Sequence, residues 1–181
     1  MIQVYCGDGK GKTSAAIGSV VRAAGHHIPV VFAQFLKDDT SGEIEILRSI
    51  PGVAVLHAAH NFGFWKSQSE EEQRTTVEEG KALLQQVQDT YQRAIRKKAD
   101  ADAEIDCLLV LDEAMAAIHA GILEEADVLS FLQQVGEQTE VILTGRNPSE
   151  RLLEAADYVS EVVPRKHPYD RGIVARTGVE M

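Results

Sequence analysis

The chain has 181 residues, of which 44% are hydrophobic and 25% charged, a composition typical of globular proteins. This length predicts a single domain, residues 1–181, that can bury a core. The formal net charge of −10 argues against nucleic acid or an anionic membrane as a partner, because both are bound through surplus Lys and Arg. No apolar run approaches the roughly 20 residues of a membrane span, and Met1 is followed by no basic leader, so we expect no signal peptide.

Two cysteines, Cys6 and Cys107, lie in apolar segments that resemble strands. Two thiols in such positions do not form the disulfide framework of a secreted protein. The sequence therefore predicts reduced thiols and a cytoplasmic protein.

A glycine-rich loop near the N-terminus carries the strongest pattern in the chain. Residues 2–5 predict a buried strand, residues 7–13 have the sequence GDGKGKT, and residues 14–24 have the apolar spacing of a helix. A strand, a loop ending in Gly-Lys-Thr and a helix are the setting of a phosphate-binding P-loop. In that setting backbone N–H groups surround an anion, Lys12 neutralises phosphate charge and the Thr13 hydroxyl binds Mg²⁺.

The loop departs from the common G-x-x-x-x-G-K-[ST] pattern, because Cys6 stands where that pattern has its first glycine. The alternative is a glycine-rich turn that binds no ligand. The strand before the loop and the helix after it favour the P-loop.

Apolar strands and amphipathic helices alternate along the rest of the chain. Further strands are expected at residues 29–35, 53–57, 107–113, 141–144, 158–163 and 173–176. Further helices are expected at residues 40–50, 69–98, 114–120, 124–137 and 149–156. Nearly continuous apolar strands suit a parallel sheet that is covered on both faces. The prediction is an α/β fold with a mostly parallel central sheet, helices on both faces and the architecture of a P-loop NTPase of the RecA-like type.

Charged residues follow two of the predicted strands. The apolar run from residue 107 ends in Asp112 and Glu113, and in P-loop proteins one such carboxylate binds Mg²⁺ while the other positions a nucleophile or a ligand. Arg146 follows the strand at residues 141–144, on the edge of the sheet where ligands bind. A surface salt bridge is the alternative role for Arg146.

Residues 60–65, HNFGFW, hold two of the five phenylalanines and the only tryptophan. This segment is either a hydrophobic plug over the core or an aromatic wall for a flat or bulky ligand. The basic loop at residues 164–172 is either a ligand contact or a solvated turn.

Seven segments, taken in order, resemble the P-loop type of ATP:cob(I)alamin (corrinoid) adenosyltransferase, a family of cobalamin biosynthesis and salvage. They are GDGKGKT at 7–13, RAAGH at 22–26, QFLK at 34–37, GE at 42–43, VLDE at 110–113, LTGR at 143–146 and KHPY at 166–169. The Asn-Lys-x-Asp motif that reads guanine is absent, as is the Asp-x-His-x-x-Gly motif of cobalamin-dependent mutases.

The resemblance implies a reaction in which Co(I) of a corrinoid attacks the 5′ carbon of ATP, giving an adenosylcorrinoid and triphosphate. It implies that ATP lies reversed in the loop, with its terminal phosphate held there. It also implies Mg²⁺ as cofactor, an electron-donating flavoprotein as partner and a homodimer. A generic P-loop kinase or ATPase is one alternative, and a non-catalytic, nucleotide-gated corrinoid carrier is another.

The resemblance also implies roles for individual residues. The residues that bind the nucleotide are Gly7, Asp8, Gly9, Lys10, Gly11, Lys12, Thr13, Ser14 and Arg22. The catalytic residues are Lys12, Glu113 and Arg146, and the metal ligands are Thr13, Asp112 and Glu113. Relatives carry Gly-Phe-x-Trp in the corrinoid loop, whereas Phe64 and Trp65 are adjacent here, so the corrinoid-binding candidates are Phe62, Phe64 and Trp65.

Overall fold

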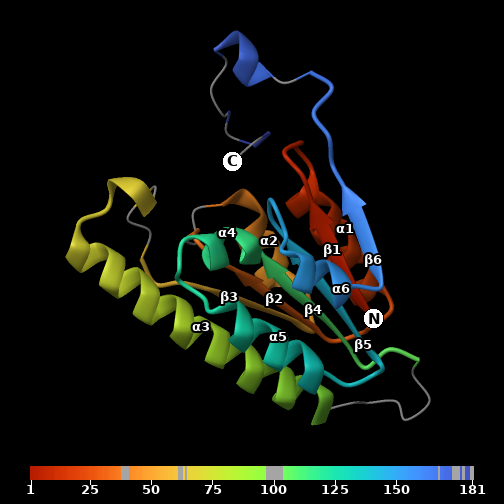
Figure 1. The fold of residues 1–181 in the computed structure, drawn as a ribbon. Coiled ribbons are helices and arrows are strands. Elements are labelled where there is room, and N and C mark those ends of the chain that lie inside the picture. Colours follow the sequence, from red (N-terminus) through yellow and green to blue (C-terminus); the bar gives the residue numbers. More distant parts are fainter. Residues whose placement is uncertain are drawn as a thin grey trace.

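A computed structural model describes residues 1–37, 41–60, 63, 65–96, 104–166, 168–172, 176, 178 and 179. Its centre is a six-stranded sheet in which every neighbouring pair of strands is parallel, in the order β3-β2-β4-β5-β1-β6 (Figure 1). The strands are β1 (Ile2–Cys6), β2 (Val30–Gln34), β3 (Val53–His57), β4 (Cys107–Asp112), β5 (Thr139–Thr144) and β6 (Tyr158–Glu161). The helices are α1 (Lys12–Gly25), α2 (Gly42–Ser49), α3 (Glu70–Arg96), α4 (Ala114–His119), α5 (Glu125–Gln134) and α6 (Glu150–Glu154), with short 3-10 turns η1 (Trp65–Ser67) and η2 (Pro168–Arg171).

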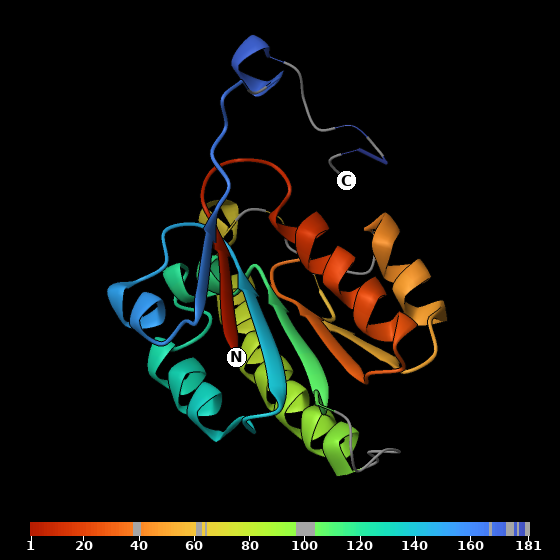
Figure 2. The same cartoon turned by 90° about the vertical axis from the view of Figure 1, so that its right-hand side faces the viewer.

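Helices cover both faces of this sheet (Figure 2). Along β4, Leu108 and Val110 join a core cluster with residues of α1 and α2, whereas Leu109 and Leu111 join a second cluster with residues of α3, α4, α5 and α6. Successive side chains of a strand point to opposite faces, so the uninterrupted apolar sequence of β4 supplies both cores at once. The predicted α/β fold with a parallel sheet is confirmed.

Polar side chains stabilise the ends of two helices as their sequences predict. At the start of α3 the backbone N–H of Ser69 donates to Glu72 Oε2 at 2.7 Å, and the N–H of Glu72 donates back to Ser69 Oγ at 3.3 Å. This reciprocal pair is a capping box. At the start of α6, Ser149 Oγ accepts a hydrogen bond from the N–H of Leu152.

The end of α5 and the start of β5 differ from the prediction. The helix ends at Gln134 rather than 137, and the strand begins at Thr139 rather than 141. The reason is Tyr91 of α3, whose hydroxyl accepts the N–H of Gly136 at 2.9 Å and lies 3.0 Å from Thr139 Oγ1. This contact ties the connection to a distant helix, which the local sequence does not reveal.

The parallel sheet brings the carboxyl ends of its strands to one edge, where β1, β2, β4 and β5 each lead into a segment with charged residues. The strand expected at 173–176 falls mostly outside the described residues, because 173–175 are not among them. Among the described helices, none combines the length and apolar character needed to cross a membrane.

Candidate active site

The loop between β1 and α1 depends on glycine at two positions for close packing. A Cβ on Gly7 would lie 2.5 Å from the carbonyl oxygen of Val162, and a Cβ on Gly9 would lie 2.7 Å from the same atom. The N–H of Gly9 donates to that oxygen at 2.7 Å. The segment after β6 therefore packs directly on the loop, which explains why glycines occur here at a spacing that differs from the common P-loop pattern.

Lys12 is held inside the loop. Its Nζ donates to the carbonyl oxygens of Gly7 at 2.7 Å and Gly9 at 3.0 Å, and only 9% of the residue is exposed. Burial lowers the pKa of the Lys12 ammonium, and the nearby Glu113 carboxylate opposes that shift. The ammonium is thus fixed where a phosphate in the loop would meet it.

Asp112, at the end of β4, faces the first turn of α1 and is completely buried. Its Oδ1 accepts hydrogen bonds from Thr13 Oγ1 at 2.9 Å and from Thr144 Oγ1 at 2.6 Å. The Thr144 hydroxyl in turn accepts the N–H of Glu113 at 2.9 Å. The network joins the first turn of α1, β4 and β5 at a single carboxylate.

The oxygens of Thr13 and Asp112 are of the kind that binds Mg²⁺. Among the described residues no group of three or more His, Cys, Asp or Glu is arranged to hold a metal. Mg²⁺ is usually held by one or two carboxylates together with substrate phosphates rather than by a full protein cage. The hydroxyl of Thr13 beside the Asp112 carboxylate fits that kind of binding.

Glu113 stands at the first residue after β4 with φ 59°, a left-handed conformation that is costly for a residue other than glycine. Burial raises the pKa of its carboxyl group, and the charge of Asp112 acts in the same direction, while Lys37, Lys12 and Arg146 oppose them. Both the backbone and the carboxylate of Glu113 are therefore held in unfavourable states, a combination that is common at functional sites.

A cavity of about 690 Å³ opens over the loop. Residues 8–14 form one wall, and Lys37 after β2 forms another with Ser41, Gly42, Glu43 and Ile46 at the start of α2. Glu113 after β4 and Arg146 after β5 add to the lining, as do Gly178 and Val179 from the C-terminal segment. Cationic side chains beside a few carboxylates suit a polyphosphate that arrives with a divalent metal.

Arg146 both faces the ligand cavity and forms a surface ion pair, the two roles that its position allows. It lines the cavity, and its Nε lies 3.6 Å from Asp8 Oδ1. Both side chains are more than 60% exposed, so this ion pair contributes little stability. The guanidinium can exchange Asp8 for a phosphate at small cost.

A comparison with models of protein families matches residues 1–181 to the family described as ATP:corrinoid adenosyltransferase BtuR/CobO/CobP. The chain belongs to this family. The chain is 34% identical over 181 residues to the corrinoid adenosyltransferase of Pseudomonas aeruginosa, an alignment that covers 99% of this chain and 83% of that protein. It is also 34% identical to the corrinoid adenosyltransferases of Escherichia coli K12 and Salmonella typhimurium, covering 99% of this chain and 85% of each.

Solved structures that resemble this member of the adenosyltransferase family support its fold. The cytoplasmic domain of EssC superimposes with a TM-score of 0.53 at 12% identity, over 97% of this chain and 33% of that chain. EssC (ATPases 2 and 3) from Geobacillus thermodenitrificans gives a TM-score of 0.52 at 12% identity, over 98% of this chain and 34% of that chain. At this identity the likeness concerns the fold alone, and it agrees with the predicted P-loop NTPase architecture.

The structure brings together most of the residues predicted to bind the nucleotide. Residues 8–14, Glu113 and Arg146 line one cavity, and Asp112 lies directly behind Thr13. Gly7 is not among the lining residues, but its carbonyl oxygen holds Lys12.

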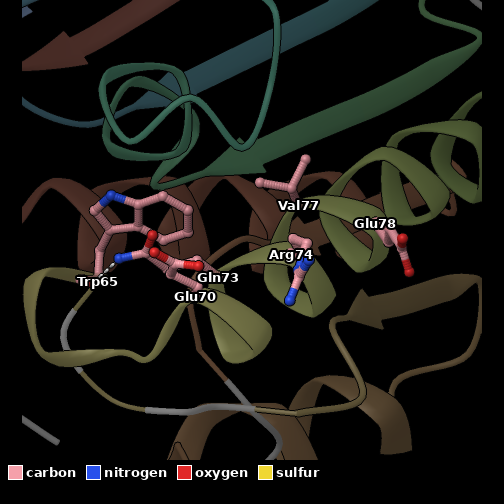
Figure 3. Close-up of a pocket in the computed structure, with 6 residues that line it drawn as sticks. All are labelled: Trp65, Glu70, Gln73, Arg74, Val77 and Glu78. Carbon is pink, nitrogen blue, oxygen red and sulfur yellow. Dashed lines mark hydrogen bonds between the residues drawn. The ribbon is translucent and has the colours of Figure 1, made fainter.

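Two residues predicted for this adenosyltransferase lie elsewhere in the described part of the chain. Arg22, near the end of α1, lines a separate groove with Gln3 and Tyr5. Trp65 is half-buried against the core and lines a third groove, of about 440 Å³, with residues of the first turns of α3 (Figure 3). Phe62 and Phe64 lie outside the described residues.

Four residues in or behind the cavity had no predicted role. They are Gln34 and Lys37 at the end of β2, Glu43 in the first turn of α2, and Thr144 at the end of β5. The sequence signal for Gln34, Lys37 and Thr144 was their position at or just after the carboxyl end of a predicted strand, whereas Glu43 stands in the helix predicted at residues 40–50. Position alone did not show which of them face one another.

Proposed function

We propose that this chain is an active adenosyltransferase that uses the loop after β1 to hold the triphosphate of ATP. Reduced Co(I) of a corrinoid attacks the 5′ carbon, a cobalt–carbon bond forms, the bond from that carbon to the phosphate oxygen breaks, and triphosphate leaves with the electron pair. Membership of the family over residues 1–181 carries the proposal, together with a cavity that joins Lys12, Thr13 and Glu113.

The chemistry requires charge stabilisation more than activation of a nucleophile. Co(I) is already strongly nucleophilic, whereas negative charge develops on the departing triphosphate. We expect Lys12 and Arg146, which line the cavity, to neutralise that negative charge. The backbone N–H groups at the start of α1 add further stabilisation of the same charge. Because these donors are already oriented, they do not have to rearrange as negative charge develops, and this favours the release of triphosphate.

Thr13, Asp112 and Glu113 are the residues that would hold Mg²⁺. When bound, Mg²⁺ neutralises charge on phosphate oxygens and orients them. Because the Thr13 hydroxyl donates its hydrogen to Asp112, its oxygen lone pairs remain available to a metal ion.

The resemblance supports a corrinoid-binding role for Phe62, Phe64 and Trp65, and a nucleotide contact for Arg22. The exposed apolar edge of the sheet supports a homodimer, since Tyr158 is 55% exposed and Val159 49% on β6. The need for Co(I) supports an electron-donating flavoprotein as partner. The free, buried thiols of Cys6 and Cys107 support a reducing, cytoplasmic setting.

Identification of the products tests this proposal. Chemically reduced cobalamin, ATP and Mg²⁺ are incubated with the protein, the corrinoid spectrum is followed, and the phosphates are separated by chromatography. We expect adenosylcobalamin and triphosphate in equal amounts. Release of ADP or phosphate with no spectral change would instead indicate a kinase or ATPase, and binding of both ligands without conversion would indicate a carrier.

The Lys12→Ala variant serves as the negative control, because it removes the buried ammonium from the loop. Its ATP affinity, measured by calorimetry, is expected to fall by about 10- to 100-fold, the loss associated with one charge-assisted contact. Lys81→Ala, which changes an exposed lysine of α3, is the matched variant and should bind ATP like the wild type.

A further inference from the structure

Gln34 is a completely buried amide in a strand whose other residues are apolar. It stands at the carboxyl end of β2, directly opposite Asp112 of β4. It does not appear among the residues that line the nucleotide cavity. A polar side chain in such a place needs partners of its own, because burying an unpaired amide is costly.

The amide group bridges two carboxylates. Its Nε2 donates to Asp112 Oδ2 at 3.0 Å and lies 3.4 Å from Glu43 Oε1. The other oxygen of Asp112, Oδ1, accepts from Thr13 and Thr144. Both oxygens of Asp112 are thus held, so its carboxylate cannot rotate without losing a hydrogen bond.

The orientation of the amide follows from charge. Turning it over would place its carbonyl oxygen against Asp112 and Glu43, two acceptors that need a donor. The observed orientation leaves Gln34 Oε1 buried without a hydrogen-bond partner in the described part of the chain. Such an orphan acceptor costs about 1–3 kcal/mol, a penalty that an apolar side chain of the same length would avoid.

We propose that Gln34 is a positioning residue that fixes Asp112 and Glu43 relative to each other on two sides of the nucleotide cavity. Asp112 stands behind Thr13, and Glu43 lines the opposite wall from the first turn of α2. Gln34 does not line the cavity, so it acts on a bound ligand only through these two carboxylates. Glu43 thereby becomes an acidic contact for the metal–nucleotide complex. The inference rests on the proposed function, because it takes Mg-ATP as the ligand.

The test measures how much Mg²⁺ improves ATP binding. Calorimetry gives the dissociation constant of ATP with Mg²⁺ and again with EDTA, and the ratio of the two is the metal benefit. In Gln34→Met, which keeps the length and loses the amide, we expect the metal benefit to fall by about 10- to 100-fold, as for other groups that orient metal-site carboxylates, while metal-free ATP binding stays the same. A merely structural role would weaken both measurements together and leave the ratio unchanged.

Gln85→Met is the matched control. Gln85 Nε2 donates to Asp89 Oδ1 at 3.1 Å, so this variant removes an amide–carboxylate bond on the exposed side of α3, where no ligand contact is proposed. Its metal benefit should equal that of the wild type.

Glu43→Gln decides the question if Gln34→Met does not fold, since Glu43 is only half-buried at a helix start. Glu43→Gln should reduce the metal benefit, as Gln34→Met does. The inference is overturned if the folded variants keep the wild-type ratio. A wild-type protein that binds ATP equally with and without Mg²⁺ would overturn the proposed metal–nucleotide site itself, and it would do so before any variant is compared.

Discussion

At the scale of single residues, Glu113 illustrates how the site costs stability. Its carboxyl has a raised pKa because it is buried and lies near Asp112. Above that raised pKa the group is ionised in both the folded and the unfolded chain, and the folded state carries the penalty. Below the ordinary pKa of 4.5 the group is neutral in both states, and the penalty disappears.

Glu113→Gln should therefore raise the melting temperature at pH 7, and the gain should shrink as pH falls through the raised pKa toward 4.5. Adenosyltransferase activity should fall in the same variant, because Glu113 lines the cavity. Calorimetric melting at several pH values measures the effect. Glu137→Gln, which changes an exposed carboxylate, should show no such trend, and an equal gain at pH 4 and pH 7 would contradict the explanation.

At the scale of helices and strands, two glycines in similar settings should respond in opposite ways. Gly80 lies in the middle of α3, where a Cβ would come 2.2 Å from Ile122 Cγ2. Gly18 lies in the middle of α1, with no atom within 4 Å of such a Cβ. Alanine favours a helix over glycine at both places, so only the packing differs.

Gly80→Ala should lower the free energy of unfolding by about 1–3 kcal/mol, because the methyl group overpacks the contact between α3 and the segment after α4. Gly18→Ala should raise it by about 0.5–1 kcal/mol. Urea denaturation of the two variants measures both changes. A stabilised Gly80→Ala would mean that α3 does not pack closely on Ile122.

At the scale of the whole molecule, the cavity joins segments from most of the chain. The loop after β1, the segment after β2, Glu113 after β4 and Arg146 after β5 all line it. A ligand bound there stabilises every segment that it contacts, and therefore the fold as a unit.

Mg-ATP at 100 times its dissociation constant should stabilise the protein by about 2.7 kcal/mol, which raises the melting temperature of a chain of this size by roughly 5–10 °C. EDTA should remove part of this increase, and inorganic triphosphate alone should reproduce part of it. Thermal denaturation with each addition measures these shifts. An unchanged melting temperature with Mg-ATP would contradict the location of the nucleotide site.

Local patterns were sufficient to predict most elements of the fold. The uninterrupted apolar runs of β2 and β4 indicated a sheet covered on both faces, and Ser69 with Glu72 marked the start of α3. Local patterns were insufficient where a distant residue sets a boundary. Tyr91 of α3 sets the start of β5, and no property of residues 134–141 alone indicates that contact.

The same division applies to the site. By itself the sequence determined the glycine-rich loop with its P-loop pattern, the two carboxylates at the end of β4 and the family, because these depend on residue types at short spacings along the chain. The sequence also grouped Thr13 with Asp112, 99 residues away, as ligands of one metal, but only the tertiary structure decided that the two side chains are hydrogen-bonded and that Gln34 lies opposite the same carboxylate. The tertiary structure also placed Arg22 and Trp65 along grooves separate from the nucleotide cavity. The physical reason is strand order: β2 and β4 become neighbours through pairing across the sheet, and the chain that separates them carries no record of that pairing.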